Sequence, residues 1–284
     1  MTTRREFVAT MGAALGVTSI GCHTAFGGLS GEESLHSIGI QLYTLRSLTS
    51  KDLEGTLQKV AEIGYREVEF AGYFGRTPVQ IRAMLAANRL TSPSTHIGLP
   101  ANDDAWKKSV DDAKAIGHEW IVIPFLDPSQ RGKTADDWKR FAAHLNELAR
   151  MAKASGLRFA YHNHDFEFAP LGGTNGYEVL QANTDPALVE YEMDIYWVVK
   201  AGADPLDLIA RYPHRFPLMH IKDASPLPER NIMNVGEGTI DFAKIFARQK
   251  TSGMQHAFVE NDSPGPDPLA AAAISYRYLA KLTF

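Results

Sequence analysis

Cysteine is almost absent from this sequence, since Cys22 is the only one in 284 residues. A single cysteine excludes both a disulfide framework and a structural zinc site built from thiolates. A surplus of basic residues is also missing, because the sum of Lys and Arg is 29, the sum of Asp and Glu is 33, and the formal net charge is -4. This balance argues against a protein that follows the backbone of nucleic acids.

Internal repeats, a boundary between two folded domains and, beyond the N-terminal leader, low-complexity tracts are lacking as well. Hydrophobic residues make up 44% and charged residues 22%, close to the average of globular proteins, so a sizeable core is available. The length suits one large α/β barrel, for which about 250 residues is typical. We therefore expect one folded domain over residues 36–284, preceded by a segment of another kind in residues 1–35.

Residues 1–35 have the pattern of an export signal followed by a linker. Arg4 and Arg5 precede an apolar, glycine-containing run over residues 8–21, which resembles a twin-arginine signal. The run is shorter than the about 20 apolar residues that a transmembrane helix needs. We expect an exported, periplasmic protein. Residues 19–22 resemble a lipoprotein box, so a lipid anchor on Cys22 stays open, although Ser19 stands where such a box usually has Leu.

From residue 37 onward, short apolar runs alternate with amphipathic segments. The expected strands are 38–43, 67–70, 94–97, 120–125, 158–161, 189–193, 218–221 and 257–259, and the expected helices are 53–63, 79–87, 105–116, 135–154, 177–182, 206–211, 242–249 and 268–281. Strict alternation implies parallel strands with crossover helices, and eight such units can close into a (β/α)8 TIM barrel. An open doubly wound sheet is the alternative, but residues 41–46 after the first strand contain no glycine-rich phosphate loop.

The stretch over residues 159–168 begins as a buried strand and ends in imidazoles and carboxylates. If the chain stays extended, His162 and His164 point to the same side, because alternate residues of a strand share a face. Two imidazoles on one face suggest a metal site or a proton relay. A pair of hydrogen-bonded histidines that caps the strand is the alternative.

Polar residues also end most of the other expected strands. These strand ends carry Glu69, His96, His162 with His164, Asp194, His220 with Lys222 and Asp223, and Glu260. Barrel enzymes build their active sites at this C-terminal face, and a mixed set of oxygen and nitrogen ligands suits Mn, Zn or another divalent ion. Singly, Glu69 could form a salt bridge at the rim, His96 could be a core histidine, and Lys222 with Asp223 could be a solvated ion pair.

At this point the sequence resembles the xylose isomerase-like barrel superfamily, within it the sugar phosphate isomerase/epimerase group that includes inosose dehydratases. The matching motifs are Gly39-Ile-Gln-Leu-Tyr43, Gly64-Tyr-Arg-Glu-Val-Glu69, Tyr161-His-Asn-His-Asp-Phe-Glu167, Met193-Asp-Ile-Tyr-Trp197, Met219-His-Ile-Lys-Asp223, Val235-Gly-Glu-Gly-Thr-Ile-Asp241 and Phe258-Val-Glu-Asn261. They span the chain after its leader and keep the family's order.

The resemblance implies a divalent ion, Mn first and Zn, Co or Mg as alternatives. Asp194, His220 and Glu260 match three of the family's ligands, and His162 stands where many relatives carry Glu. In the related epimerases two metal-bound carboxylates lie on opposite faces of the substrate carbon. Only Glu260 remains of that pair, so a symmetrical two-carboxylate epimerisation is in doubt.

We therefore expect a mechanism with one base, in which a proton is removed next to a carbonyl. The candidate catalytic residues are Glu260, His164 or Glu167 as the second proton-transfer group, and Lys222 as a contact to developing negative charge. The candidate substrate contacts are Glu69, His96, Trp197 and Tyr43.

This chemistry covers isomerisation, epimerisation, dehydration and β-elimination. Export makes an unphosphorylated sugar, keto-glycoside or cyclitol the expected substrate; nucleic acid is not an expected partner, and a homo-oligomer stays open. Two rivals remain, a non-catalytic sugar-binding barrel and an endonuclease-like metal hydrolase of the same superfamily. The acidic balance and the leader argue against the second.

Overall fold

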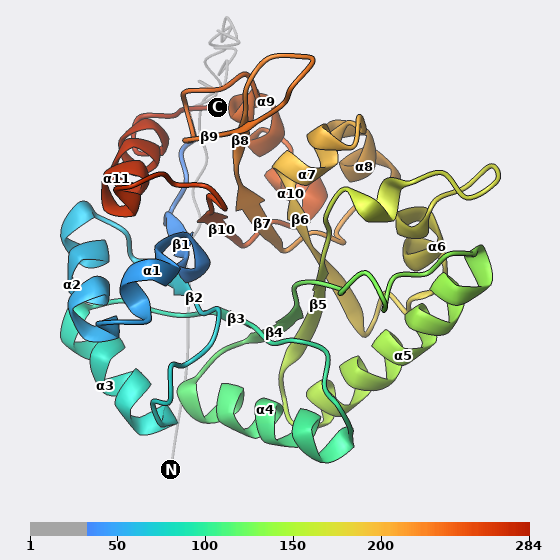
Figure 1. The fold of residues 1–284 in the computed structure, drawn as a ribbon, viewed down its shortest axis with the longest axis horizontal. Coiled ribbons are helices and arrows are strands. Elements are labelled where there is room, and N and C mark those ends of the chain that lie inside the picture. Colours follow the sequence, from blue (N-terminus) through green and yellow to red (C-terminus); the bar gives the residue numbers. More distant parts are fainter. Residues whose placement is uncertain (1–32) are drawn as a thin grey trace, which may run out of the picture. The chain divides into compact units, whose positions relative to one another are not determined.

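The structure, a computed structural model, describes residues 33–284. Its main sheet consists of eight parallel strands: β1 (Gly39–Gln41), β2 (Glu67–Glu69), β3 (Ser94–His96), β4 (Trp120–Ile123), β5 (Arg158–His162), β6 (Val189–Asp194), β7 (Leu218–Ile221) and β10 (His256–Val259). Their order is β2-β1-β10-β7-β6-β5-β4-β3. Parallel bridges from Glu67 to Thr91 and from Phe70 to Thr95 join the edge strands β2 and β3. The sheet thus forms a nearly closed barrel, which confirms the predicted single TIM barrel (Figure 1).

Helices surround these strands (Figure 1). They are α2 (Leu53–Ile63), α3 (Pro78–Asn88), α4 (Asp103–Ile116), α5 (Ala135–Ala154), α6 (Gly176–Asn183), α8 (Pro205–Arg211), α9 (Phe242–Phe246), α10 (Gln249–Ser252) and α11 (Pro268–Leu279). The bounds of α2 and α5 equal the predicted ones. Polar caps explain the starts, since Asp52 accepts a hydrogen bond from Gly55 N before α2 and Thr134 forms a capping box with Asp137 before α5.

The structure departs from the predicted elements at the C-terminal side of three strands. The predicted strand over 38–43 ends at Gln41, where a 3-10 helix (Leu42–Leu45) and α1 (Arg46–Thr49) begin, because the Gln41 side chain accepts a hydrogen bond from Tyr43 N. A short helix, α7 (Ile195–Lys200), follows β6 and is capped by Asp194. After β7 the chain forms an antiparallel pair, β8 (Asp223–Ala224) with β9 (Ile232–Met233).

Two further departures concern the loop after β5 and a helix near the C-terminus. A 3-10 helix (Phe166–Phe168) lies in the loop after β5. The helix predicted over 242–249 is divided into α9 and α10, with a turn at Ala247 and Arg248 between them.

The barrel interior changes character along its axis. A small apolar cluster occupies its middle and consists of Trp120, Val122, Ala160, Leu218 and Phe258. Toward the C-terminal ends of the strands, the buried side chains become imidazoles and carboxylates. A larger apolar cluster fills the layer between the strands and the surrounding helices and supplies most of the buried apolar surface.

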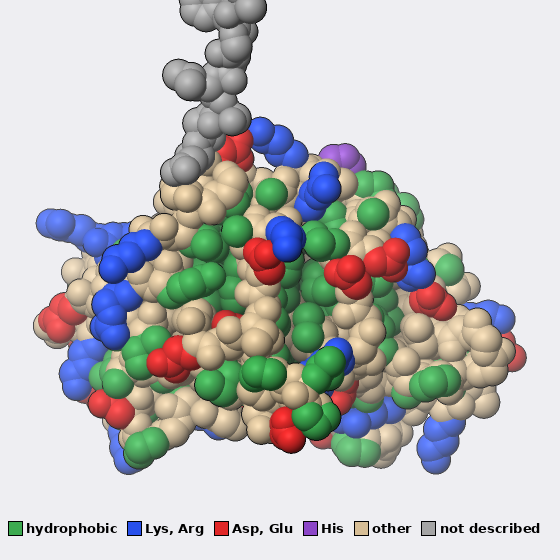
Figure 2. All heavy atoms as spheres, turned by 90° about the horizontal axis from the view of Figure 1, so that it is seen from above, with side chains coloured by type: hydrophobic (Ala, Val, Ile, Leu, Met, Phe, Trp, Pro, Cys, Tyr) green, Lys and Arg blue, Asp and Glu red, His purple; other side chains and the backbone are tan. Residues whose placement is uncertain are grey.

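The two ends of the described segment lie side by side, since Glu33 and Phe284 exchange two backbone hydrogen bonds. The predicted export signal and Cys22 lie outside the described residues. Within residues 33–284, none of the helices combines the length and the apolar character that crossing a bilayer would require. Figure 2 shows one face of the domain, on which basic and acidic side chains are interspersed.

Candidate active site

A cavity of about 710 Å³ lies at the C-terminal ends of the strands. Most of the predicted site residues line it, namely Tyr43, His96, His162, His164, Trp197, Lys222 and Glu260. They come from loops and strand ends that are far apart in the sequence and meet because all strands of the barrel run in the same direction. The cavity therefore stands where a barrel enzyme would bind its substrate.

The four predicted metal ligands meet beside this cavity. His162, Asp194, His220 and Glu260 each offer one ligand atom, these atoms lie within 4.8 Å of one another, and all four residues are buried. Strand register produces the arrangement, because Asp194 on β6 is level with His220 on β7. His162 Nε2 lies 3.5 Å from Asp194 Oδ2, and His220 Nδ1 lies 2.8 Å from Glu260 Oε2. Two imidazole nitrogens and two carboxylate oxygens form a donor set suited to a divalent ion.

The ammonium group of Lys222 lies beside two of these four residues, Asp194 and Glu260. Its Nζ lies 2.9 Å from Asp194 Oδ2, 2.7 Å from Glu260 Oε2 and 2.9 Å from Asp262 Oδ2. Burial alone would lower the pKa of Lys222, but the three carboxylates hold it well above its usual value. Burial would raise the pKa of Glu260, yet Lys222 and His220 hold it well below its usual range, so this carboxylate is ionised.

Asp223 has a different role from its neighbour. It is buried, and its carboxylate accepts hydrogen bonds from the backbone N–H groups of Gly236, Gly238 and Ile240. Asp223 therefore holds the loop after β9 in place. The alternative of a solvated ion pair with Lys222 is wrong, because both side chains are about 1% exposed and have other partners.

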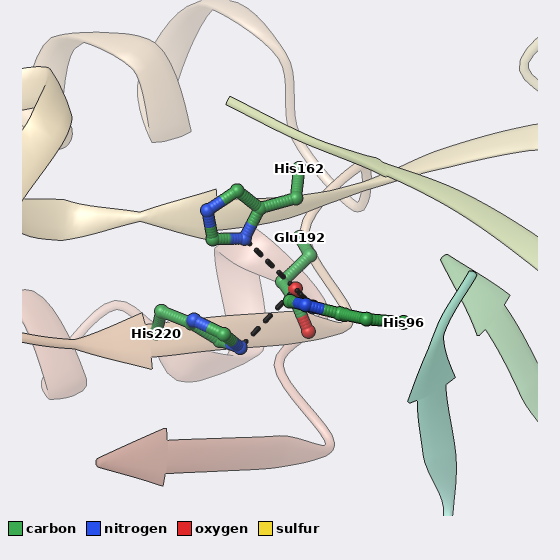
Figure 3. Close-up of side chains that lie close together, drawn as sticks. All are labelled: His96, His162, Glu192 and His220. Carbon is green, nitrogen blue, oxygen red and sulfur yellow. Dashed lines mark hydrogen bonds and ion pairs between the residues drawn. The ribbon is translucent and has the colours of Figure 1, made fainter. Parts of the chain in front are cut away.

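A second group of side chains lies deeper in the barrel, and Figure 3 shows how His96, His162 and His220 gather around Glu192. Glu192 Oε2 lies 2.7 Å from His96 Nε2, 2.9 Å from His162 Nδ1 and 3.2 Å from His220 Nε2. Glu192 was not among the predicted site residues, although its position two residues before Asp194 on the same strand places both side chains on one face.

Glu69 belongs to this inner group. It is fully buried, does not line the cavity, and lies 2.7 Å from His220 Nε2 and 3.1 Å from His96 Nε2. Gln41 donates a further hydrogen bond of 2.7 Å to it. This position favours support of the histidines over the predicted contact with substrate. The alternative of a salt bridge at the barrel rim is wrong, because Glu69 is fully buried and pairs with histidines inside the barrel.

His164 and Glu167, the two candidates for the second proton-transfer group, occupy different places. His164 lines the cavity, and its Nδ1 is buried with no hydrogen-bond partner among the described residues. Burial lowers its pKa to about 3, so the ring is neutral. Glu167 is fully buried behind it, accepts hydrogen bonds from Tyr161 Oη and from the His164 backbone N–H, and does not line the cavity.

Comparisons with known proteins show the family and the fold of this chain. The family model described as xylose isomerase-like TIM barrel matches residues 57–282. An inosose dehydratase from Geobacillus kaustophilus (strain HTA426) is 23% identical over 269 residues, which cover 80% of this chain and 86% of the relative.

Two solved structures are also similar to this chain in fold. A sugar phosphate isomerase/epimerase from Parabacteroides distasonis ATCC 8503 is 27% identical with a TM-score of 0.75, and the match covers 87% of this chain and 95% of that chain. The IOLI protein, solved with a bound zinc atom, shares the fold at 14% identity and a TM-score of 0.66, covering 85% of this chain and 95% of that one.

Proposed function

Since the chain belongs to the xylose isomerase-like TIM barrel family, we propose that it is a metal-dependent enzyme that removes a proton next to a carbonyl of an unphosphorylated sugar, keto-glycoside or cyclitol. Relatives named as an inosose dehydratase and a sugar phosphate isomerase/epimerase support an isomerase, epimerase or dehydratase of sugars or cyclitols. The predicted export signal supports an unphosphorylated substrate outside the cytoplasm. The observation that carries the proposal is the convergence of four buried ligand atoms beside the cavity.

The residues present fit a divalent ion. Asp194, Glu260 and Asp262 surround one ammonium group, so three negative charges face one positive charge and two remain for a divalent cation to balance. His162, Asp194, His220 and Glu260 would hold the ion, with Mn²⁺ as the first expectation and Zn, Co or Mg as alternatives. When bound, such an ion polarises a substrate carbonyl or hydroxyl as a Lewis acid.

Glu260 is the base in this proposal. It borders the cavity, and Lys222 and His220 keep its carboxylate ionised and ready to accept a proton from the substrate carbon. Lys222 would stabilise negative charge that develops on the substrate oxygen, because it lines the cavity beside Glu260.

His164 is the second proton-transfer group, and Glu167 positions it. The neutral ring of His164 borders the cavity, and its Nδ1 has no hydrogen-bond partner within residues 33–284, whereas Glu167 accepts hydrogen bonds from the His164 backbone and from Tyr161. A carboxylate and an imidazole thus replace the paired carboxylates of the related epimerases. This asymmetry favours isomerisation, dehydration or β-elimination over a symmetrical epimerisation.

A non-catalytic sugar-binding barrel is the remaining candidate, because Tyr43 and Trp197 in the cavity would serve a binder equally well. A binder would not need two buried carboxylates beside two imidazoles. An endonuclease-like hydrolase is disfavoured by the acidic net charge and by the interspersed charges of the face in Figure 2.

Elemental mass spectrometry of the purified protein tests the proposal. We expect about one divalent ion per chain by the coordination argument above, and its loss in Asp194→Ala, His220→Ala and Glu260→Ala, each checked for folding. Glu54→Ala removes an exposed carboxylate on α2 and is the control. The metal-loaded protein should also exchange a proton of an inosose or keto sugar with deuterated solvent. Folded protein that neither contains nor takes up Mn²⁺ or Zn²⁺ would refute the proposal and leave the binder.

A further inference from the structure

Each of the two proposed histidine ligands faces carboxylates on both sides of its ring. His162 Nδ1 lies 2.9 Å from Glu192 Oε2, while its Nε2 faces Asp194. His220 Nε2 lies 2.7 Å from Glu69 Oε2, while its Nδ1 faces Glu260. An inner and an outer set of carboxylates therefore share the same two imidazoles.

A neutral imidazole cannot serve both sets in the same way. One ring nitrogen carries a hydrogen and the other carries the lone pair, so a nitrogen that holds a cation leaves the opposite nitrogen as a donor. Two groups of possible metal ligands share His162 and His220. The inner group adds His96 and Glu192, and the outer group adds Asp194 and Glu260 at the cavity wall. If the outer group holds the ion, His162 Nδ1–H and His220 Nε2–H must both donate into the barrel.

The acceptors for these two hydrogens are in place. Glu192 is fully buried, and its Oε2 is in reach of His96, His162 and His220 together (Figure 3). Glu69 Oε2 contacts two of the same rings and is oriented by Gln41. Register brings Glu192 to His162, because these residues are direct neighbours on β6 and β5.

We propose that Glu192 is a positioning residue, which holds His162 and His220 in the tautomers that turn His162 Nε2 and His220 Nδ1 toward the cavity. The inference rests on the proposed function, since it concerns the same metal centre. Hydrogen-bond partners of this kind fix the orientation of ligating histidines and raise their basicity. Glu69 assists on the side of His220.

The test is Mn²⁺ affinity of the full chain, measured by titration calorimetry, for the wild type and Glu192→Gln. Loss of such a partner weakens metal binding by about 10- to 100-fold, and we expect this with the stoichiometry unchanged. Glu190→Gln is the matched control, because Glu190 lies two residues earlier on β6 and binds Trp120 and Arg158 instead of the histidines. Its Mn²⁺ affinity should equal that of the wild type.

A spectroscopic measurement separates positioning from a general loss of structure. In a proton–nitrogen correlation spectrum of the zinc-loaded wild type, His162 should carry its hydrogen on Nδ1 and His220 on Nε2. Glu192→Gln should lose the single tautomer of His162 while its circular dichroism stays that of the wild type.

Three outcomes would overturn the inference. In the first, Glu192→Gln binds Mn²⁺ as tightly as the wild type. In the second, the wild-type rings carry their hydrogens on the nitrogens that face the cavity. In the third, the wild type binds two ions and Glu192→Gln binds one, so that the inner group is itself a metal site. A wild type without any metal affinity would instead refute the proposed function together with this inference.

Discussion

Lys222 and Glu260 form a buried ion pair beside the cavity, with 2.7 Å between Nζ and Oε2. Removing the ammonium takes away the positive charge that Glu260, Asp194 and Asp262 share, and the loss of one partner of a buried pair costs about 3 to 5 kcal/mol of unfolding free energy. We therefore expect Lys222→Met to melt at a much lower temperature in EDTA. Mn²⁺ should raise the melting temperature more in the variant than in the wild type, because it restores positive charge.

Lys244→Met is the control for this experiment. Lys244 pairs with Asp241 on the surface, where solvent screens the charges, so the variant should melt like the wild type with and without metal. An equal response of Lys222→Met and wild type to Mn²⁺ would show that Lys222 and the ion do not share one set of carboxylates.

Glu167 should make the protein less stable as the pH rises. Burial raises its pKa in the folded protein to about 7 from 4.5, so the folded state keeps a proton that the unfolded state releases between these values. A shift of this size corresponds to a stabilisation of at most about 3 kcal/mol. This stabilisation is complete below pH 4.5 and is lost as the pH rises through 7. Glu167→Gln should therefore gain stability relative to the wild type over this range in chemical denaturation, unlike Glu54→Gln at the surface.

His118 should make the protein less stable as the pH falls. It is buried beside Tyr73 with Nδ1 2.7 Å from Ser92 O, and burial lowers its pKa to about 4 from 6.5. The unfolded state takes up a proton that the folded state refuses, so stability is present above pH 6.5 and lost as the pH falls to 4.

His118→Phe removes this dependence. The variant loses one hydrogen bond, which costs about 1 kcal/mol at pH 7, and its disadvantage should shrink or reverse as the pH falls. Urea unfolding at several pH values measures the difference, with the exposed His144→Phe as control. Parallel pH profiles of His118→Phe and wild type would contradict the prediction.

Trp197 should report ligand binding. It is the tryptophan that lines the cavity, whereas Trp106, Trp120 and Trp138 are buried in the domain. Its indole Nε1 has no hydrogen-bond partner among the described residues and is available to a sugar hydroxyl. An inosose or keto sugar should change the tryptophan fluorescence of the wild type, and Trp197→Phe should lose this change and bind about tenfold more weakly, as expected for one lost hydrogen bond. A full signal in the variant would place the ligand elsewhere.

The barrel was predictable because its local patterns agree with one another. Apolar strands, capped helices and glycine stops are properties of short segments, so α2 and α5 have the predicted bounds and Gly64 and Gly117 end helices with positive φ angles. The family match over residues 57–282 likewise confirms the resemblance inferred from the strand-end motifs. Helix α7 has no counterpart among the predicted helices; the candidate metal ligand Asp194 also caps it by accepting a hydrogen bond from Trp197 N.

The sequence by itself determined that eight strands alternate with helices and that His162, Asp194, His220 and Glu260 stand at strand ends, since both follow from order and spacing along the chain. Only the tertiary structure decided which side chains touch. The register of β5 against β6 brings Glu192 to His162, and barrel closure brings Glu69 to His220. Burial then keeps Glu167 protonated, and the carboxylates of Asp194, Glu260 and Asp262 keep Lys222 charged; both effects depend on distances between residues far apart in sequence.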